Sequence, residues 1–207
     1  MKIGIYGGTF DPVHFGHLLL AESARETLRL DQVLFVPARI PPHKQDKSLT
    51  DEADRVAMLK LALEGNPDFA LEMFELEQNQ VSYTVHTVEF LSQKYSDAEL
   101  FLLMGEDMLR IFPKWYLPKR ICELCTPAVI GRDGNEIGDL DFLAEIASSE
   151  TLEKIRASRV PMPSVAFSST AIRAAIADRK SIRYHTPDAV IHYIEERGLY
   201  KSSLFDR

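Results

Sequence analysis

Two histidines near the amino terminus carry the clearest chemical potential in this sequence. His14 and His17 stand three residues apart, shortly after a glycine turn that ends at Gly8. An imidazole near neutral pH can donate a hydrogen bond to a phosphate oxygen and can carry a positive charge. Glycine lets a ligand approach the backbone, and the unpaired N–H groups of a helix's first turn attract anions. The pattern predicts a phosphate-binding site, whereas a glycine pair alone is typical of an ordinary turn.

These residues lie where a strand is expected to pass into a helix. Ile3, Ile5 and Tyr6 form a short apolar run that fits a buried strand, and residues 18–28 have helical composition and spacing. If the helix has begun before the histidines, both imidazoles share one of its faces. The structural alternative is a polar helix start without a ligand.

A second group of residues repeats this arrangement near the carboxyl terminus. Ser168, Ser169 and Thr170 follow a short apolar run at 165–167, and Arg173 comes one turn later. Hydroxyl groups cap helix starts, and the arginine would face back toward the free N–H groups. A capping motif with an incidental arginine is the alternative here.

Strand-like and helix-like segments alternate along most of the chain. Strands are expected at 33–36, 69–76, 100–104, 128–130 and 165–167. Helices are expected at 50–63 (with Thr50 as N-cap), 84–94, 117–124 and 169–178, and a last one runs to residue 197 from a capped start at 186–188. The acidic, helix-prone segment 136–159 carries no chemical motif and is expected to be peripheral. This alternation predicts an α/β fold with a mostly parallel sheet, helices on both faces, and one domain with a small helical part from about residue 168.

Composition limits the classes of function. The chain has 207 residues, enough for one domain with a full core, and a net charge of -7. This charge argues against a protein whose main partner is a nucleic-acid backbone. No apolar run is long enough to span a membrane and no signal peptide is evident, so a cytoplasmic protein is expected. The sequence leaves open whether the chain forms a homo-oligomer.

The two cysteines, Cys122 and Cys125, form a C-x-x-C pattern. A zinc site would need a second pair of ligands, and a redox motif would need a thioredoxin-like context. Neither is present in the sequence. We therefore expect two small apolar residues on one helical face.

The stretch 7–17, GGTFDPVHFGH, resembles the H-x-G-H signature of the nucleotidylyltransferase superfamily, and in particular that of bacterial nicotinate mononucleotide adenylyltransferases. Further segments are similar to this family's motifs in the family's order: PPHK at 41–44, SYT at 82–84, G-x-D at 105–107, F-P-x-W at 112–115 and S-S-T-x-I-R at 168–173. The fingerprints G-x-G-x-x-G and G-x-x-x-x-G-K-[ST] are absent. The resemblance implies a Rossmann-like fold and transfer of the adenylyl group of ATP to nicotinate mononucleotide, giving nicotinate adenine dinucleotide and pyrophosphate in NAD biosynthesis.

The resemblance also implies roles for single residues. The catalytic residues would be His14, His17 and Arg173. ATP would contact Gly8, Thr9, Phe10, His14, His17, Gly105, Asp107, Arg132, Ser168, Ser169, Thr170 and Arg173. The mononucleotide would contact Lys44, Thr84, Trp115 and Tyr116. No protein metal site is implied, since Mg²⁺ would arrive with ATP. Other acceptors, such as nicotinamide mononucleotide or phosphopantetheine, and a nucleotide sensor without catalysis remain the alternatives.

Overall fold

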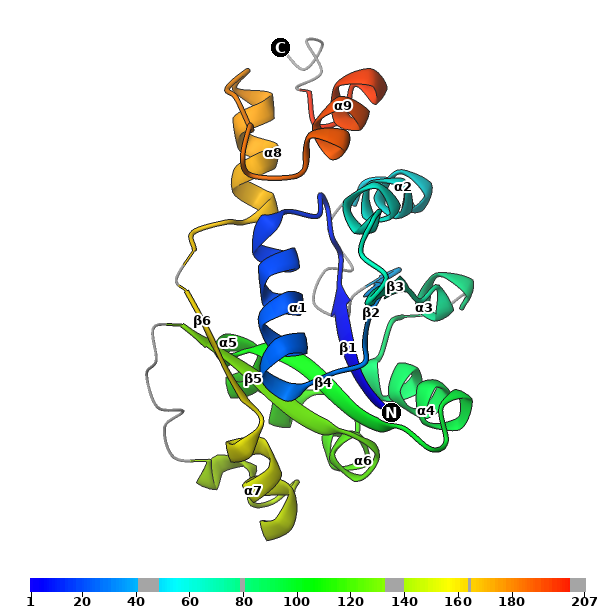
Figure 1. Ribbon diagram of the computed structural model, residues 1–207, viewed down its shortest axis with the longest axis vertical. Coiled ribbons are helices and arrows are strands. Elements are labelled where there is room, and N and C mark those ends of the chain that lie inside the picture. Colours follow the sequence, from blue (N-terminus) through cyan, green and yellow to red (C-terminus); the bar gives the residue numbers. More distant parts are fainter. Residues whose placement is uncertain (41–48, 79–80, 133–139, 164, 202–207) are drawn as a thin grey trace.

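The sheet at the centre of the fold is parallel throughout and determines where the site residues lie. The computed structural model describes residues 1–40, 49–78, 81–132, 140–163 and 165–201, the side chain of Arg132 excepted. Within these ranges six strands pair in the order β3-β2-β1-β4-β5-β6 (Figure 1). They are β1 (Lys2–Gly8), β2 (Gln32–Pro37), β3 (Phe69–Leu71), β4 (Glu99–Gly105), β5 (Thr126–Arg132) and β6 (Arg159–Met162). The predicted α/β class and parallel sheet are confirmed.

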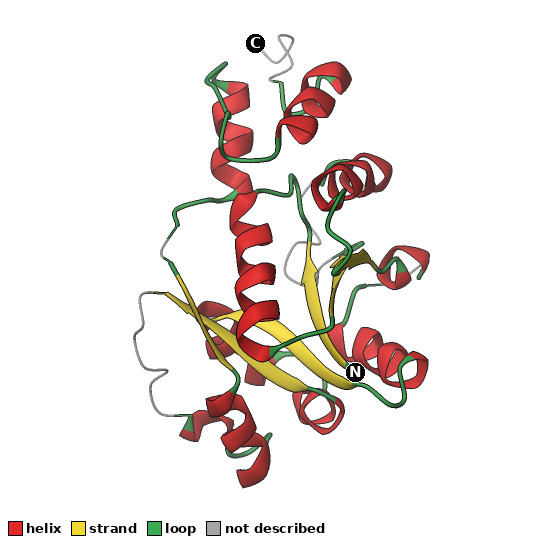
Figure 2. Ribbon diagram, viewed as in Figure 1, coloured by secondary structure: helices red, strands yellow, loops and turns green. Residues whose placement is uncertain are grey.

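Helices lie on both sides of the sheet, as Figure 2 shows. One core is shared by α1 (Phe15–Leu28), α2 (Glu52–Leu63), α8 (Ser169–Ala177) and α9 (Asp188–Arg197). The other is shared by α4 (Thr84–Lys94), α5 (Glu106–Ile111), α6 (Pro118–Leu124) and α7 (Ser149–Ala157). The short helices are α3 (Phe74–Glu77) and the 3₁₀ turns η2 (Phe112–Lys114) and η3 (Asp141–Leu143). None of the described helices is long and apolar enough to cross a membrane.

Alternation along the strands divides the apolar side chains between these two cores. In β1, Ile5 belongs to the core with α4 to α7, whereas Tyr6 belongs to the core with α1 and α2. In β4, Leu102 and Phe101 divide in the same way. Each such burial contributes roughly 1.5–3 kcal/mol. Because the central strands are buried on both faces, their sequences are continuous apolar runs.

The strand expected at 69–76 is shorter than the sequence pattern suggests. It ends at Leu71, because the next residue, Glu72, turns the chain. One carboxylate oxygen of Glu72 accepts the N–H of Phe74 at 3.2 Å, and the other pairs with Lys94 at 2.6 Å. The expected strand therefore continues as a two-residue connection, and its last residues, 74–76, belong to α3.

The strand expected at 165–167 is wrong. The sixth strand, β6, comes earlier and begins at the last residue of the segment 136–159, which we expected to be acidic and helix-prone; its Arg159 lies opposite Val129 in the parallel register. The ring of Phe167 lies instead near that of His14, with centroids 6.3 Å apart. A tertiary contact thus outweighs the strand preference of a short apolar run.

The start of α2 differs from the prediction by one residue. Asp51, rather than Thr50, is the N-cap, and its Oδ1 accepts the N–H of Ala53 at 2.8 Å. The shift leaves the Thr50 backbone outside the helix. Its N–H and its carbonyl then contact the buried side chains of Asp11 and Arg55 beneath the site, as described below.

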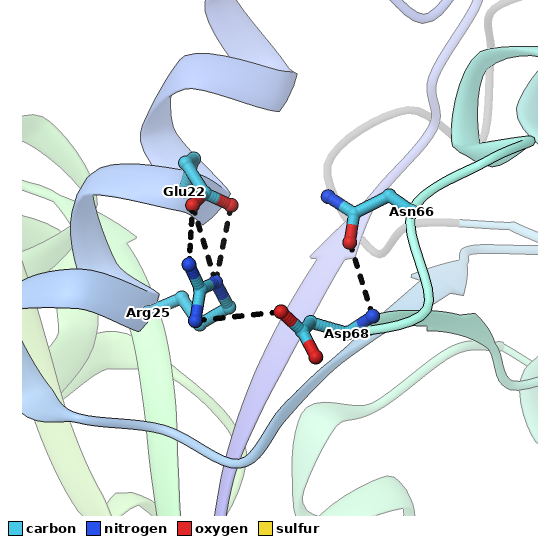
Figure 3. Close-up of polar contacts among 4 residues, drawn as sticks. All are labelled: Glu22, Arg25, Asn66 and Asp68. Carbon is cyan, nitrogen blue, oxygen red and sulfur yellow. Dashed lines mark hydrogen bonds and ion pairs between the residues drawn. The ribbon is translucent and has the colours of Figure 1, made fainter.

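Partly exposed ion pairs connect the carboxyl end of α1 to the turn before β3 (Figure 3). Arg25 pairs with Glu22 at 2.6 Å and with Asp68 at 3.4 Å. Asn66 Oδ1 accepts the N–H of Asp68 at 3.0 Å. Partly exposed pairs of this kind contribute at most about 1 kcal/mol. The cluster lies at the amino-terminal edge of the sheet, opposite the site.

The two cysteines are packing residues, but they do not share a helical face as the sequence predicts: Cys122 lies in α6, whereas Cys125 follows its last residue with an extended backbone. Both thiols are free, and burial raises the pKa of Cys122 to about 11. Cys125 is buried, and its Sγ donates to the Ile121 carbonyl at 3.4 Å. Neither thiol has the lowered pKa that a reactive cysteine needs.

Candidate active site

The predicted site lies at the carboxyl edge of the sheet, between β1 and β4. The chain builds β2 and β3 on one side of β1 and then resumes with β4 on the other side. Ligands of open α/β sheets bind at such switch points, because the connecting loops diverge there. Gly8 ends β1, Gly105 ends β4, and Asp107 lies in the first turn of α5. All three residues therefore lie at this edge.

His14 and His17 cap the start of α1 reciprocally. His14 is the N-cap residue, and its Nδ1 accepts the N–H of His17 at 3.3 Å. Nδ1 of His17 accepts the N–H of His14 at 3.2 Å. The rings are stacked, with centroids 3.6 Å apart and 15° between their planes. Because each Nδ1 is an acceptor, each neutral ring carries its proton on Nε2, and that N–H is a donor.

Burial keeps the His14 ring uncharged. The residue is 5% exposed, and burial lowers its pKa to about 4, while a backbone hydrogen bond opposes this shift and His185 adds to it. At neutral pH, His14 is therefore a hydrogen-bond donor without a positive charge. The cationic role that the sequence allowed for either imidazole does not apply to this one.

Glycine at position 16 is required by the space around the His14 ring. A Cβ at Gly16 would lie 3.1 Å from that ring and 3.2 Å from the Cβ of Phe167. Both neighbours are held by packing and would have to move. The glycine of the H-x-G-H pattern thus lets the first histidine ring lie against the helix start.

Phe10 supports the loop after β1 by packing. Its ring is buried and lies edge-on to the rings of Tyr6 and His17, with centroids 5.5 and 5.0 Å apart. Its backbone is left-handed, with φ at 48°. A Cβ at Gly8 would lie 3.0 Å from the Phe10 ring. The whole residue is 1% exposed, so Phe10 supports the loop from beneath.

The second predicted motif lies directly against the first. Ser169 Oγ donates to the Pro12 carbonyl at 2.9 Å, and Arg173 Nη1 donates to the Asp11 carbonyl at 2.6 Å. Arg173 Nη2 also donates to Thr170 Oγ1 at 3.4 Å. The contact of Ser169 with Pro12 joins residues 157 positions apart, and that of Arg173 with Asp11 joins residues 162 positions apart. The start of α8 thus lies beside the start of α1, which brings the two predicted phosphate motifs together (Figure 1).

Ser168 has the capping role that was the structural alternative. Its Oγ accepts the N–H of Ala171 at 3.0 Å at the start of α8. An accepting hydroxyl keeps its own hydrogen for donation. Ser168 and Thr170 are both exposed, so the cap does not prevent either from meeting a ligand.

Sequence reasoning missed a buried arginine beneath this surface. Arg55 is 1% exposed, and its Nη1 donates to the carbonyls of Thr9 at 3.0 Å and Ala38 at 2.8 Å. Its Nε donates to the Thr50 carbonyl at 3.1 Å. A signal was present in the sequence, because Arg55 precedes the apolar Leu59 by one turn on the inner face of α2.

Asp11 was also missed as a separate contributor. It is 2% exposed; its Oδ1 accepts the hydroxyl of Tyr200 at 2.6 Å, and its Oδ2 accepts the N–H of Thr50 at 3.3 Å. We call Asp11, Thr50, Arg55 and Tyr200 the Asp11 cluster. It joins the loop after β1, the start of α2 and the segment after α9.

Two of the segments expected to contact the mononucleotide are adjacent. Thr84 is the first residue of α4, and the preceding Tyr83 ring lies 4.9 Å from that of Tyr116, centroid to centroid. Trp115 follows η2, and its ring lies edge-on to Phe112 at 5.4 Å. Phe112 thus packs against one side of the indole. The side chain of Tyr116 is more accessible, since this residue is 51% exposed.

A buried carboxylate supports the start of α4. Glu75 is 8% exposed, and its Oε1 accepts the hydroxyl of Thr87 at 2.6 Å. Burial raises the pKa of Glu75, and hydrogen bonds from Thr87 and Ser82 oppose that shift. Ser82 Oγ also accepts the N–H of Arg39 at 2.9 Å. Glu75 therefore holds the segment before Thr84 against the loop after β2.

Two predicted site residues lie outside the described part of the chain. They are Lys44, within 41–48, and the side chain of Arg132, whose backbone ends β5 at the same edge of the sheet. In the described ranges, no group of three or more His, Cys, Asp or Glu side chains could hold a metal ion.

Comparisons with known proteins identify the family of the chain. Residues 5–175 match the model of the cytidylyltransferase-like family. The nicotinate-nucleotide adenylyltransferase of Bacillus subtilis (strain 168) is 42% identical over 201 residues, which cover 97% of this chain and 99% of that protein. A protein of Thermomicrobium roseum described as a probable nicotinate-nucleotide adenylyltransferase is also 42% identical over 201 residues, covering 97% of this chain and 92% of that protein.

A solved structure supports the fold independently. The nicotinic acid mononucleotide adenylyltransferase of Plasmodium falciparum, complexed with NaAD, superposes with a TM-score of 0.72. The match covers 96% of this chain and 97% of that one at 18% identity, which supports the fold alone. The family follows from the matched model and from the two bacterial relatives. The chain belongs to the cytidylyltransferase-like family and, within it, to the nicotinate-nucleotide adenylyltransferases.

Proposed function

We propose that this chain transfers the adenylyl group of ATP to nicotinate mononucleotide, forming nicotinate adenine dinucleotide and pyrophosphate in NAD biosynthesis. One observation carries the proposal. The reciprocally capped histidine pair lies beside Arg173 at the β1/β4 edge, in a chain 42% identical to a nicotinate-nucleotide adenylyltransferase.

The reaction needs alignment more than proton transfer. An oxygen of the mononucleotide phosphate attacks the α-phosphorus of ATP in line. A new O–P bond forms, the bond from the α-phosphorus to the oxygen bridging to the β-phosphorus breaks, and pyrophosphate leaves with the electron pair. The attacking phosphate is already anionic at neutral pH, so no protein nucleophile or base is required. Positioning and neutralisation of phosphate charge supply the catalysis.

The residues have complementary tasks in this scheme. The Nε2–H groups of His14 and His17 donate to the phosphates from one side, and Arg173 offers the cation that the uncharged His14 does not. Thr9 and the backbone near Gly8 and Phe10 share the first side, and Ser168, Ser169 and Thr170 share the second. Gly105, Asp107 and Arg132 serve the ATP nucleoside, and Lys44, Thr84, Trp115 and Tyr116 serve the mononucleotide.

Magnesium is expected to arrive bound to ATP. Mg²⁺ keeps several waters and prefers the phosphate oxygens of a nucleotide to an all-protein cage. The ion would add positive charge at the leaving pyrophosphate. The chain's own contribution at that position would be Arg173 and Thr170.

The test is pyrophosphate release from ATP with each acceptor offered in turn. Release with nicotinate mononucleotide is the expected result. Release only with nicotinamide mononucleotide or phosphopantetheine would assign another acceptor. No release with any acceptor, together with intact ATP binding, would identify a nucleotide sensor.

A further inference from the structure

We infer that Arg55 is a positioning residue of the ATP site, which offsets the negative charge of Asp11 beneath the phosphate-binding loop and holds that loop through its backbone carbonyls. The inference rests on the proposed function, because it takes this loop as the place where the triphosphate binds.

The contacts of Arg55 join three separate segments. Its guanidinium donates to Thr9 after β1, to Ala38 after β2 and to Thr50 before α2. The N–H of Ala38 also donates to the Gly8 carbonyl at 2.8 Å. A planar fork with several donors can satisfy carbonyls in different directions, which an ammonium group does less well. Arg55 thereby fixes the exit of β1, where the phosphates are expected.

The charge of Asp11 is the reason that a cation is needed there. Its carboxylate is 2% exposed, and its own carbonyl receives Arg173, the proposed phosphate anchor. A carboxylate in low-dielectric surroundings repels a bound triphosphate far more than an exposed one would. Asp11 remains in place because Tyr200 and Thr50 donate to it.

Arg55 is close enough to oppose that repulsion. Thr50 connects the two charges, since its N–H donates to Asp11 and its carbonyl accepts from Arg55. Burial lowers the pKa of Arg55, and the charge of Asp11 opposes this shift more than that of Glu52, Tyr200 or Asp51 does. The cluster is therefore close to neutral in sum, and the loop above it can accept an anion.

Four variants separate charge from hydrogen bonding. Arg55→Lys keeps a charged donor, Arg55→Gln keeps a neutral donor, Asp11→Asn removes the opposing charge, and the fourth combines Arg55→Gln with Asp11→Asn. The dissociation constant of Mg·ATP is measured by calorimetry without an acceptor, and folding is checked by circular dichroism. Arg25→Gln is the matched control, because it removes the same charge from an exposed pair at the opposite sheet edge (Figure 3).

Charge compensation predicts an ordered result. Arg25→Gln keeps ATP affinity within about threefold of wild type, whereas Arg55→Gln weakens it at least about tenfold. Arg55→Lys keeps the charge but loses the planar fork, so its affinity lies between these two. Adding Asp11→Asn to Arg55→Gln restores affinity at least to that of Arg55→Lys. Equal losses in the lysine and glutamine variants, or no restoration in the double variant, would overturn the inference.

Two further outcomes keep the test decisive. If Arg55→Gln does not fold, Asp11→Asn alone decides: its ATP affinity should be unchanged or tighter, and a tenfold loss contradicts charge compensation. A wild-type chain that binds ATP but releases no pyrophosphate with any acceptor overturns the proposed function alone. A wild-type chain that does not bind ATP overturns both.

Discussion

His14 and His17 hold each other in place: each Nδ1 accepts the backbone N–H of the other residue, and the rings stack 3.6 Å apart. Each side chain thus has one nitrogen committed to the helix start and one nitrogen with a proton to donate. A substitution that keeps only one of the two ring nitrogens' roles, the acceptor at Nδ1 or the donor at Nε2, can therefore distinguish an effect on folding from an effect on catalysis.

Substitutions at His17 should separate these two tasks. Asparagine places an acceptor near the position of Nδ1, so His17→Asn should keep the cap yet lose at least about a hundredfold in turnover, or roughly 3 kcal/mol of transition-state stabilisation. Glutamine places an amide near Nε2, so His17→Gln should lose about 1 kcal/mol of stability and retain more turnover. Pyrophosphate release and denaturant unfolding measure the two quantities. Near-normal turnover in a folded His17→Asn variant would remove the catalytic role.

The buried neutral ring of His14 should make the protein less stable in acid. The folded pKa is about 4 against an ordinary 6.5, so the unfolded chain takes up this proton first as the pH falls. The contribution is complete above pH 6.5 and is lost as the pH falls toward 4. It amounts to about 2 kcal/mol between pH 7 and pH 4.5. Denaturant unfolding at both pH values measures it, and His14→Asn, which lacks this titration, should show a correspondingly weaker pH dependence.

A methyl group at position 16 should affect catalysis more than folding. Gly16→Ala gains about 1 kcal/mol of helix propensity, which offsets much of the strain against the His14 ring and Phe167. The displaced ring should still lower turnover about tenfold or more, since small misplacements of a reacting geometry are costly. Steady-state kinetics and a thermal melt test both parts. Unchanged turnover would mean that the ring position is unimportant.

Glu75 should tolerate loss of its charge but not loss of its acceptor. Because burial raises its pKa, the ionised form is disfavoured in the folded chain, so this group's contribution to stability declines as the pH rises through its folded pKa. Glu75→Gln should therefore be at least as stable as wild type at neutral pH. Glu75→Ala leaves Thr87 and Ser82 without their acceptor and should lose about 2–3 kcal/mol. Equal stabilities of the two variants in urea unfolding would contradict this account.

The features that sequence reasoning predicted depend on local pattern. The turn at Gly8 and the cap at Ser168 each follow from a few neighbouring residues, and the structure contains both. The helix expected from residue 18 begins three residues earlier, with His14 as its N-cap. The strand predicted from the apolar run at 165–167 is absent, because tertiary contacts determine the conformation of this run more than its own residues do.

The Asp11 cluster could not be predicted in this way. The contact between Arg55 and the Thr9 carbonyl spans 46 positions, and that between Tyr200 and Asp11 spans 189. Periodicity shows that Arg55 faces inward but not which carbonyls it meets. Such contacts depend on how the helices pack on the sheet, and the sequence of a single segment does not determine that packing.

The hydrogen bond from Tyr200 to Asp11 has a consequence for synthesis of the chain. Thr186 makes a comparable contact, donating to the Val13 carbonyl at 2.8 Å. A ribosome adds Tyr200 189 residues after Asp11, so the loop at residue 11 leaves the exit tunnel long before its partner exists. Contacts between residues so far apart in sequence are intrinsically slow to form, because a long loop must close first. A nascent chain can thus carry every residue of the opening motif and still lack the contact that holds Asp11 until Tyr200 has been added.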